Sequence, residues 1–151
     1  MAWRRILLAM LMLVGVCELG HAQRGRGFYE NNYANVDRRD PRYRPHPSGG
    51  RTADFAAKYS ALAASGAKWR ITSDCASACT MGFGYFPKSR VCISRNVKLG
   101  FHQGNNASAT AALWQSYTDE IRSMIDARGG LRLEWLWIPA REFHRLGYPV
   151  C

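Results

Sequence analysis

The chain has 151 residues, of which 47% are hydrophobic, and its formal net charge is +10 at pH 7. This length supports one hydrophobic core but not two, so we expect a single folded domain with one function. The basic charge would suit a nucleic acid in the cytosol. However, no face combines basic and aromatic residues, and the leader described next directs the chain out of the cytosol, so we predict no nucleic-acid partner.

Residues 1–22 have the pattern of a secretory signal peptide. Residues 3–5 (WRR) give a positive start, and the apolar run 6–16 is too short to cross a bilayer as a stable helix. Residues 20–22 (GHA) form a cleavage site of the small-x-small type. We therefore predict cleavage after Ala22 and a periplasmic or secreted protein.

A lipid anchor at Cys17 is less favoured, because a small residue would precede a lipidated cysteine and Val16 stands there. Cleavage would remove Arg4, Arg5 and Glu18 and leave a formal charge of +9. Outside the cytosol, such a charge suits an anionic lipid, polysaccharide or peptide. A basic solvated surface without a specific partner is the more frequent case.

Residues 23–47 are rich in Arg, Asn, Tyr and Pro and have no helical or strand period, which predicts a disordered basic linker. The folded domain is expected over residues 48–151. Its first helix ends at Gly66 and carries apolar residues at helical spacing. These residues are Phe55, Tyr59, Leu62 and Ala63. A short buried strand is expected over residues 68–72.

The middle of the chain predicts a second helix and two short strands. The helix begins at or just after Ser77 and ends before Pro87. Its inward-facing side chains are Met81 and Phe83. The two strands lie near residues 90–93 and 97–101.

The longest helix is expected over residues 108–128 and ends at the glycine pair 129–130. One face of this helix is apolar. The residues on it are Leu113, Tyr117, Ile121, Met124 and Ile125. Pro139 suits the first turn of a last helix that continues to Leu146. The alternation of helices and strands predicts a layered α/β domain.

Four cysteines remain after loss of Cys17, and an even number in an exported chain favours disulfides over free thiols. Of the three connectivities, we favour Cys79 with Cys92 and Cys75 with Cys151. The reason is that Cys75 and Cys79 would otherwise compete for a bridge across one turn. A zinc site is less favoured, because the cysteines lack the second close pair of structural zinc sites, and we predict no metal.

The candidate chemistry centres on Ser77, in the compact segment 74–80 (DCASACT), and on His102, in the segment 99–103 (LGFHQ). A serine hydroxyl is inert near neutral pH unless a base takes its proton, and histidine is the commonest such base. The pair therefore predicts acyl transfer, in the form of hydrolysis. The structural alternatives are that Ser77 caps a helix N-terminus and that His102 is a buried histidine at a strand end.

Short motifs follow one another in an order that has a counterpart in a known family. They are residues 49–50 (GG), then a helix and a strand, residues 76–78 (ASA), another strand, and residues 101–103 (FHQ). This order resembles the Clp protease proteolytic subunit and the wider crotonase-like superfamily, with the same serine-to-histidine interval. The glycine pair, CASACT, GFH and the terminal cysteine are also similar to small exported Clp-like proteins of bacteria. The resemblance covers residues 48–151 and implies a reduced, disulfide-stapled crotonase-like core.

The resemblance implies roles for five residues. Ser77 would be the nucleophile and His102 the general base. The N–H groups of Gly50 and Ala78 would be the oxyanion donors. In the family, the orienting acid lies about a dozen residues before the Tyr-Gly of the last helix. Counting back from Gly147 reaches Trp135, next to Glu134, so Glu134 is the predicted orienting acid.

One segment departs from the family pattern. Residues 42–47 are basic and interrupted by prolines, whereas the family has a hydrophobic strand before its glycine pair.

Two functions follow from this sequence. The first is an exported serine hydrolase that cleaves a peptide or ester and needs no cofactor, and the resemblance implies that it assembles as a homo-oligomer. The alternative is a non-catalytic envelope module that uses its basic charge to hold an anionic surface.

Overall fold

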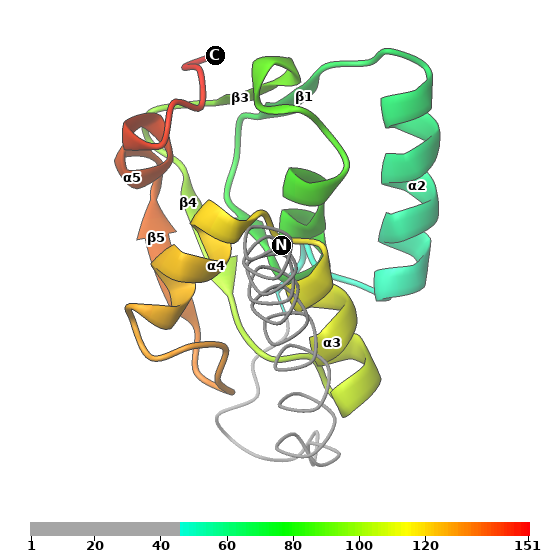
Figure 1. Ribbon diagram of the computed structural model, residues 1–151, viewed down its shortest axis with the longest axis vertical. Coiled ribbons are helices and arrows are strands. Elements are labelled where there is room, and N and C mark those ends of the chain that lie inside the picture. Colours follow the sequence, from blue (N-terminus) through cyan, green and yellow to red (C-terminus); the bar gives the residue numbers. More distant parts are fainter. Residues whose placement is uncertain (1–45) are drawn as a thin grey trace, which may run out of the picture.

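The computed structural model of the protein describes residues 46–151 (Figure 1). The predicted signal peptide and nearly all of the predicted linker lie outside these residues. In chain order, the elements are α2 (Thr52–Ala64), β1 (Trp69–Ile71), β2 (Cys75–Ala76), the 3₁₀-helix η1 (Ser77–Gly84), the 3₁₀-turn η2 (Lys88–Arg90), β3 (Val91–Ile93), β4 (Lys98–Phe101), α3 (Ala107–Gln115), α4 (Asp119–Asp126), β5 (Leu136–Pro139) and α5 (Ala140–Arg145).

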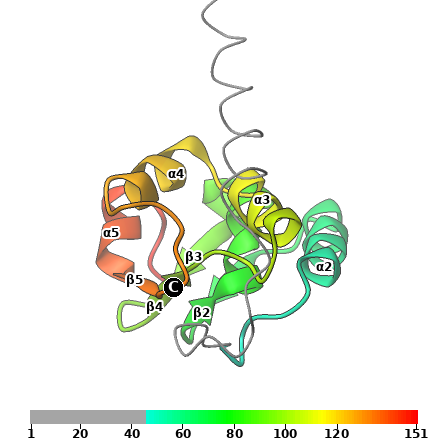
Figure 2. The same ribbon diagram turned by 90° about the horizontal axis from the view of Figure 1, so that it is seen from below.

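The strands form two small sheets. In the first, β1 pairs with β3 in parallel. In the second, the order is β2-β4-β5, with β2 parallel and β5 antiparallel to β4. Helix α2 lies at one side of the domain and α5 at the opposite side, with strands between them (Figures 1 and 2). The α/β class predicted from the sequence is confirmed.

The core consists of aromatic and aliphatic side chains from almost every element. The rings of Phe83 and Phe143 stack with their centroids 5.2 Å apart, and the Phe101 ring also stacks with Phe143, at a centroid distance of 6.1 Å. These contacts tie η1, β4 and α5 together. As predicted, Met81 and Phe83 are both buried. Their burial anchors η1 in the core, and this fixes the position of Ser77, the first residue of η1.

The structure confirms five of the predicted elements. The first helix corresponds to α2 and the strand after it to β1. The helical segment that begins at Ser77 corresponds to η1, and the next two strands correspond to β3 and β4. The predicted stop at Gly66 is also confirmed, because this residue has φ +79 just beyond α2. Glycine adopts such a conformation without the steric cost of a Cβ.

The single long helix predicted over residues 108–128 is wrong, because α3 and α4 are separate helices. Ser116 follows α3, and its carbonyl lies so close to Gly84 that any Cβ on this glycine would clash with it. Thr118 then has an extended backbone (φ −67, ψ 159), and two acidic residues follow in the first turn of α4, where they stabilise a helix N-terminus. The apolar face stays buried across the break at Leu113, Tyr117, Ile121 and Ile125.

All four described cysteines form disulfides, but the favoured pairing is wrong. The bonds join Cys75 to Cys79 and Cys92 to Cys151. The tight turn from β2 into η1 brings the first pair to a Cα separation of 5.4 Å, which suits a disulfide. The chain end runs beside β3, where the Cys151 N–H donates to the Ile93 carbonyl at 3.3 Å, and this places it next to Cys92.

Two disulfides are consistent with an extracellular or periplasmic protein, since such compartments are oxidising. Within residues 46–151, no helix has both the length and the apolar character needed to span a membrane.

Candidate active site

Ser77 lies at the turn where β2 ends and η1 begins. Its φ is +57, and within residues 46–151 it is the only residue other than glycine with a positive φ. A side chain with a Cβ is disfavoured in this region by roughly 1–2 kcal/mol. Strained residues of this kind concentrate at functional sites, and a nucleophilic serine is typically presented on such a strand-to-helix turn.

The turn is held from several sides. The disulfide between Cys75 and Cys79 encloses it. Thr80 Oγ1 donates to the Ser77 carbonyl at 2.7 Å and lies 2.8 Å from the Tyr117 hydroxyl. Because the Thr80 hydroxyl proton is already donated to the Ser77 carbonyl, the Tyr117 hydroxyl donates the second bond to Thr80 Oγ1. Burial raises the pKa of Tyr117, which keeps the phenol protonated for this bond.

The strain at Ser77 predicts a stability difference between two variants that lack the hydroxyl. Ser77→Gly removes the Cβ, whereas Ser77→Ala keeps it, so we expect the glycine variant to be more stable by about 1 kcal/mol. Urea denaturation of both variants measures this difference. A Ser77→Ala variant as stable as Ser77→Gly would contradict a left-handed conformation at this residue.

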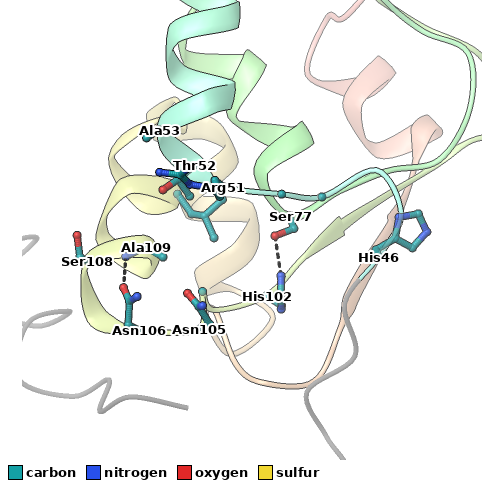
Figure 3. A pocket seen from close by; sticks show the side chains of 14 residues that line it. His46, Arg51, Thr52, Ala53, Ser77, His102, Asn105, Asn106, Ser108 and Ala109 are labelled. Carbon is teal, nitrogen blue, oxygen red and sulfur yellow. Dashed lines mark hydrogen bonds between the residues drawn. The ribbon is translucent and has the colours of Figure 1, made fainter. Parts of the chain in front are cut away.

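His102 follows β4 and meets Ser77. The parallel pairing aligns Ala76 with Gly100, so the residues that follow β2 and β4 lie at the same edge of the sheet. His102 Nε2 is 2.8 Å from Ser77 Oγ (Figure 3). When the imidazole proton is on Nδ1, the serine hydroxyl donates to Nε2, which is the arrangement for proton removal.

The helix-cap interpretation of Ser77 is wrong. The cap position of η1 is Ala76, and no side chain caps this helix. The Ser77 hydroxyl instead contacts the imidazole of His102. This difference favours a chemical role for the hydroxyl over a role in helix termination.

The His102 imidazole is buried, with 3% of its surface exposed. Trp135 stacks on it at a centroid distance of 3.9 Å and an interplanar angle of 27°. Burial lowers the pKa of His102 to about 4, because a charged imidazolium is poorly solvated there. The ring is therefore neutral at pH 7 and is able to accept a proton.

The low pKa of His102 predicts a loss of stability in acid. Between its ordinary pKa of 6.5 and about 4, the histidine is protonated in the unfolded chain but neutral in the folded one. Its stabilising contribution is therefore present above pH 6.5 and falls by about 3 kcal/mol as the pH drops to 4. Urea denaturation of the wild type and of His102→Gln across this range isolates the contribution. A difference between them that does not change with pH would contradict the low pKa.

An open cavity of about 790 Å³ lies beside the serine and histidine (Figure 3). Its walls come from the chain before α2, the start of α2, the segment after β4 and the start of α3. Small and uncharged polar side chains predominate, and within the described residues no aspartate or glutamate lines it. The members are His46, Gly49, Gly50, Arg51, Thr52, Ala53, Ser77, His102, Gly104, Asn105, Asn106, Ser108, Ala109 and Leu113. The cavity can hold a small polar substrate or a short peptide segment next to the Ser77 hydroxyl.

The two residues predicted as oxyanion donors lie near Ser77. Gly50 lines the cavity with Ser77, and Ala78 is the second residue of η1. The first N–H groups of a helix have no partner within the helix, so the Ala78 N–H is directed toward the helix start. The Gly49 N–H donates to the His46 carbonyl at 2.8 Å, whereas within residues 46–151 the Gly50 N–H has no such acceptor.

Glu134, the predicted orienting acid, lies in the segment between α4 and β5 and its side chain is exposed. Its neighbour Trp135 packs on His102, and Arg132 accepts a 2.7 Å hydrogen bond from the Gln103 N–H. The segment therefore runs beside the histidine. The role of Glu134 stays a prediction.

Sequence reasoning missed two contributors to the site. Trp135 covers the His102 ring, and Ser48 Oγ accepts a hydrogen bond from the Ala76 N–H at 2.9 Å. Neither residue belongs to a periodic segment, so no pattern pointed to it. The only signal was position: Ser48 directly precedes the glycine pair, and Trp135 directly follows Glu134.

Fold and site together define an α/β domain with a paired serine and histidine that both line one open cavity. No protein-family model, no curated protein and no solved structure matches the chain. The functional conclusion therefore depends on the geometry of the site itself.

Proposed function

We propose that the protein is an exported serine hydrolase that cleaves a peptide or an ester, with Ser77 as nucleophile and His102 as general base. The observation that carries the proposal is the 2.8 Å contact between Ser77 Oγ and His102 Nε2, made by a serine in a left-handed strand-to-helix turn. The geometry carries this assignment, because Nε2 of a neutral imidazole within hydrogen-bond distance of a hydroxyl is placed to take its proton.

The reaction would proceed in two halves. Ser77 Oγ attacks the substrate carbonyl carbon while its proton moves to His102 Nε2, and the carbonyl oxygen becomes an oxyanion. The N–H groups of Gly50 and Ala78 would stabilise this charge. The bond to the leaving group then breaks, and His102 returns the proton to the leaving nitrogen or oxygen. Water then attacks the acyl-serine while His102 takes one of its protons. The bond between the acyl carbon and Ser77 Oγ breaks, His102 returns the proton to Ser77 Oγ, and the acid is released.

The resemblance to Clp-like and other crotonase-like proteins supports the same assignment. The two parallel strands that precede Ser77 and His102 are paired directly, so the motifs that carry the resemblance meet in space. We propose on this basis that the domain is a reduced, disulfide-stapled relative of that superfamily, exported through its predicted leader and assembled as a homo-oligomer.

Hydrolysis of p-nitrophenyl esters and of a peptide library by the oxidised, signal-cleaved protein tests the proposal. We expect turnover that is lost in Ser77→Ala. Turnover that survives this substitution would contradict the proposal.

The alternative, a non-catalytic module that holds an anionic surface, predicts a different result. The protein would bind anionic vesicles or polysaccharide in a salt-sensitive way, unchanged in Ser77→Ala, and would hydrolyse nothing.

A further inference from the structure

A short turn over residues 46–49 leads into the glycine pair and is held by hydrogen bonds among its own residues. The Gly49 N–H donates to the His46 carbonyl at 2.8 Å, and the Ser48 N–H donates to His46 Nδ1 at 3.2 Å. Ser48 Oγ lies 2.8 Å from the same nitrogen. Since Nδ1 accepts the Ser48 N–H, it carries no proton, so the Ser48 hydroxyl must be the donor. The lone pairs of Ser48 Oγ are then left to accept a hydrogen bond from elsewhere.

Ser48 Oγ accepts that bond from the β2 strand. The Ala76 N–H donates to it at 2.9 Å. β2 is an edge strand, and Ala76 is fully buried, so its N–H requires an acceptor inside the protein. In a wider sheet, the carbonyl of a further strand would supply it. Here the Ser48 side-chain oxygen accepts the hydrogen bond instead. The segment just before it, residues 42–47, is interrupted by prolines and is not expected to form such a strand.

The docked turn places the glycine pair against the nucleophile. A Cβ built on Gly49 would lie 3.1 Å from Ser77 Cβ and 3.5 Å from Ser77 Oγ. The chain from His46 to Arg51 passes beside Ser77 on its way to α2 (Figure 3). Gly50 follows directly, so its distance from Ser77 depends on where the turn is held.

We propose that Ser48 is a positioning residue, which fixes the Gly49–Gly50 backbone against Ser77 through its bonds to Ala76 and His46. The proposal rests on the proposed hydrolase function and adds the residue that sets the oxyanion geometry. A misplacement of about 1 Å in a catalytic site reduces rates by as much as about 100-fold.

The test measures the rate at which a fluorophosphonate labels Ser77, followed by intact mass. We expect Ser48→Ala to be labelled about 10- to 100-fold more slowly than the wild type, and Ser48→Thr, which keeps the hydroxyl, to recover most of the rate. The pH profile of labelling should keep its shape, because the Ser77–His102 contact is not altered. Amide exchange at Ala76 should become faster in Ser48→Ala only.

Two further variants separate positioning from general loss of stability. Asp74→Ala removes another side-chain acceptor of a strand N–H, that of Lys98 at 2.7 Å, and should be labelled at the wild-type rate. His46→Phe keeps an aromatic ring beside Trp135 and Trp137 but lacks Nδ1, and should lose about tenfold. This variant also tests the turn if Ser48→Ala does not fold.

The outcomes distinguish this inference from the function on which it rests. Labelling of Ser48→Ala at the wild-type rate, or an equal loss in Asp74→Ala, would overturn the positioning role while leaving the hydrolase proposal intact. Absence of labelling in the folded wild type would contradict the hydrolase proposal, and the positioning role would fall with it.

Discussion

Under the proposed hydrolase function, the Ser77→Ala variant is expected to lose activity by a factor on the order of 10³ or more, because the proposed acyl-enzyme forms on the Ser77 hydroxyl. The substitution removes only the hydroxyl and keeps the Cβ, so the left-handed turn and its supporting contacts should persist. Turnover of the most reactive p-nitrophenyl ester by the wild type and the variant measures the loss.

A matched control exists in Ser89, an exposed serine in η2 away from the cavity. Ser89→Ala should retain the wild-type rate. If Ser77→Ala also retained it while circular dichroism showed a folded protein, the nucleophile would lie elsewhere or the chain would not be a hydrolase.

Removal of the disulfide between Cys92 and Cys151 is expected to cost about 4 kcal/mol of the free energy of unfolding. The bond joins residues with a sequence separation of 59 and so closes a long loop in the unfolded chain. Loss of the bond increases the conformational entropy of the unfolded chain, and this increase is larger for a longer loop. Urea denaturation of the Cys92→Ser/Cys151→Ser double variant measures this loss.

The second disulfide provides the comparison. Cys75 and Cys79 are separated by only four positions, so their removal should cost about 2 kcal/mol. Removal of the Cys75–Cys79 disulfide should have a larger effect on the rate at which Ser77 is labelled, because Ser77 lies in the loop that this bond closes. A greater loss of stability from the Cys75→Ser/Cys79→Ser variant would contradict this ranking, and peptide mapping without reduction would check the pairing itself.

Local patterns predicted most of the elements. These patterns depend only on residues that are close together in the sequence. They are the apolar spacing that predicted α2, the short apolar runs that predicted β1, β3 and β4, and the glycine that ends α2 at Gly66. The proximity of Ser77 and His102 was also predicted, because serine and histidine commonly act as nucleophile and base and because their interval matches that of the family the chain resembles.

The errors arose where distant residues decide the outcome. The break between α3 and α4 depends on Gly84 approaching Ser116 from another part of the chain, and helical periodicity does not report such a contact. The cysteine pairing was wrong because spacing along the chain does not show that the terminus runs beside β3. Both are tertiary effects.

The residues missed at the site have the same origin. Trp135 belongs to the irregular chain before β5, where neither helical nor strand periodicity applies, and its stacking on His102 requires the fold to bring the two together. Ser48 acts through a hydrogen bond to Ala76, 28 positions away. A serine in a turn is usually explained by the turn alone.

The most direct test of an activated Ser77 is fluorophosphonate labelling of the oxidised protein, produced without the predicted leader 1–22, with the modified peptide identified by mass spectrometry. We predict one adduct, on Ser77, that is formed in the wild type and lost in His102→Ala. Absence of an adduct in well-folded wild-type protein, or an adduct whose formation does not depend on His102, would contradict the assignment of these two residues as nucleophile and base.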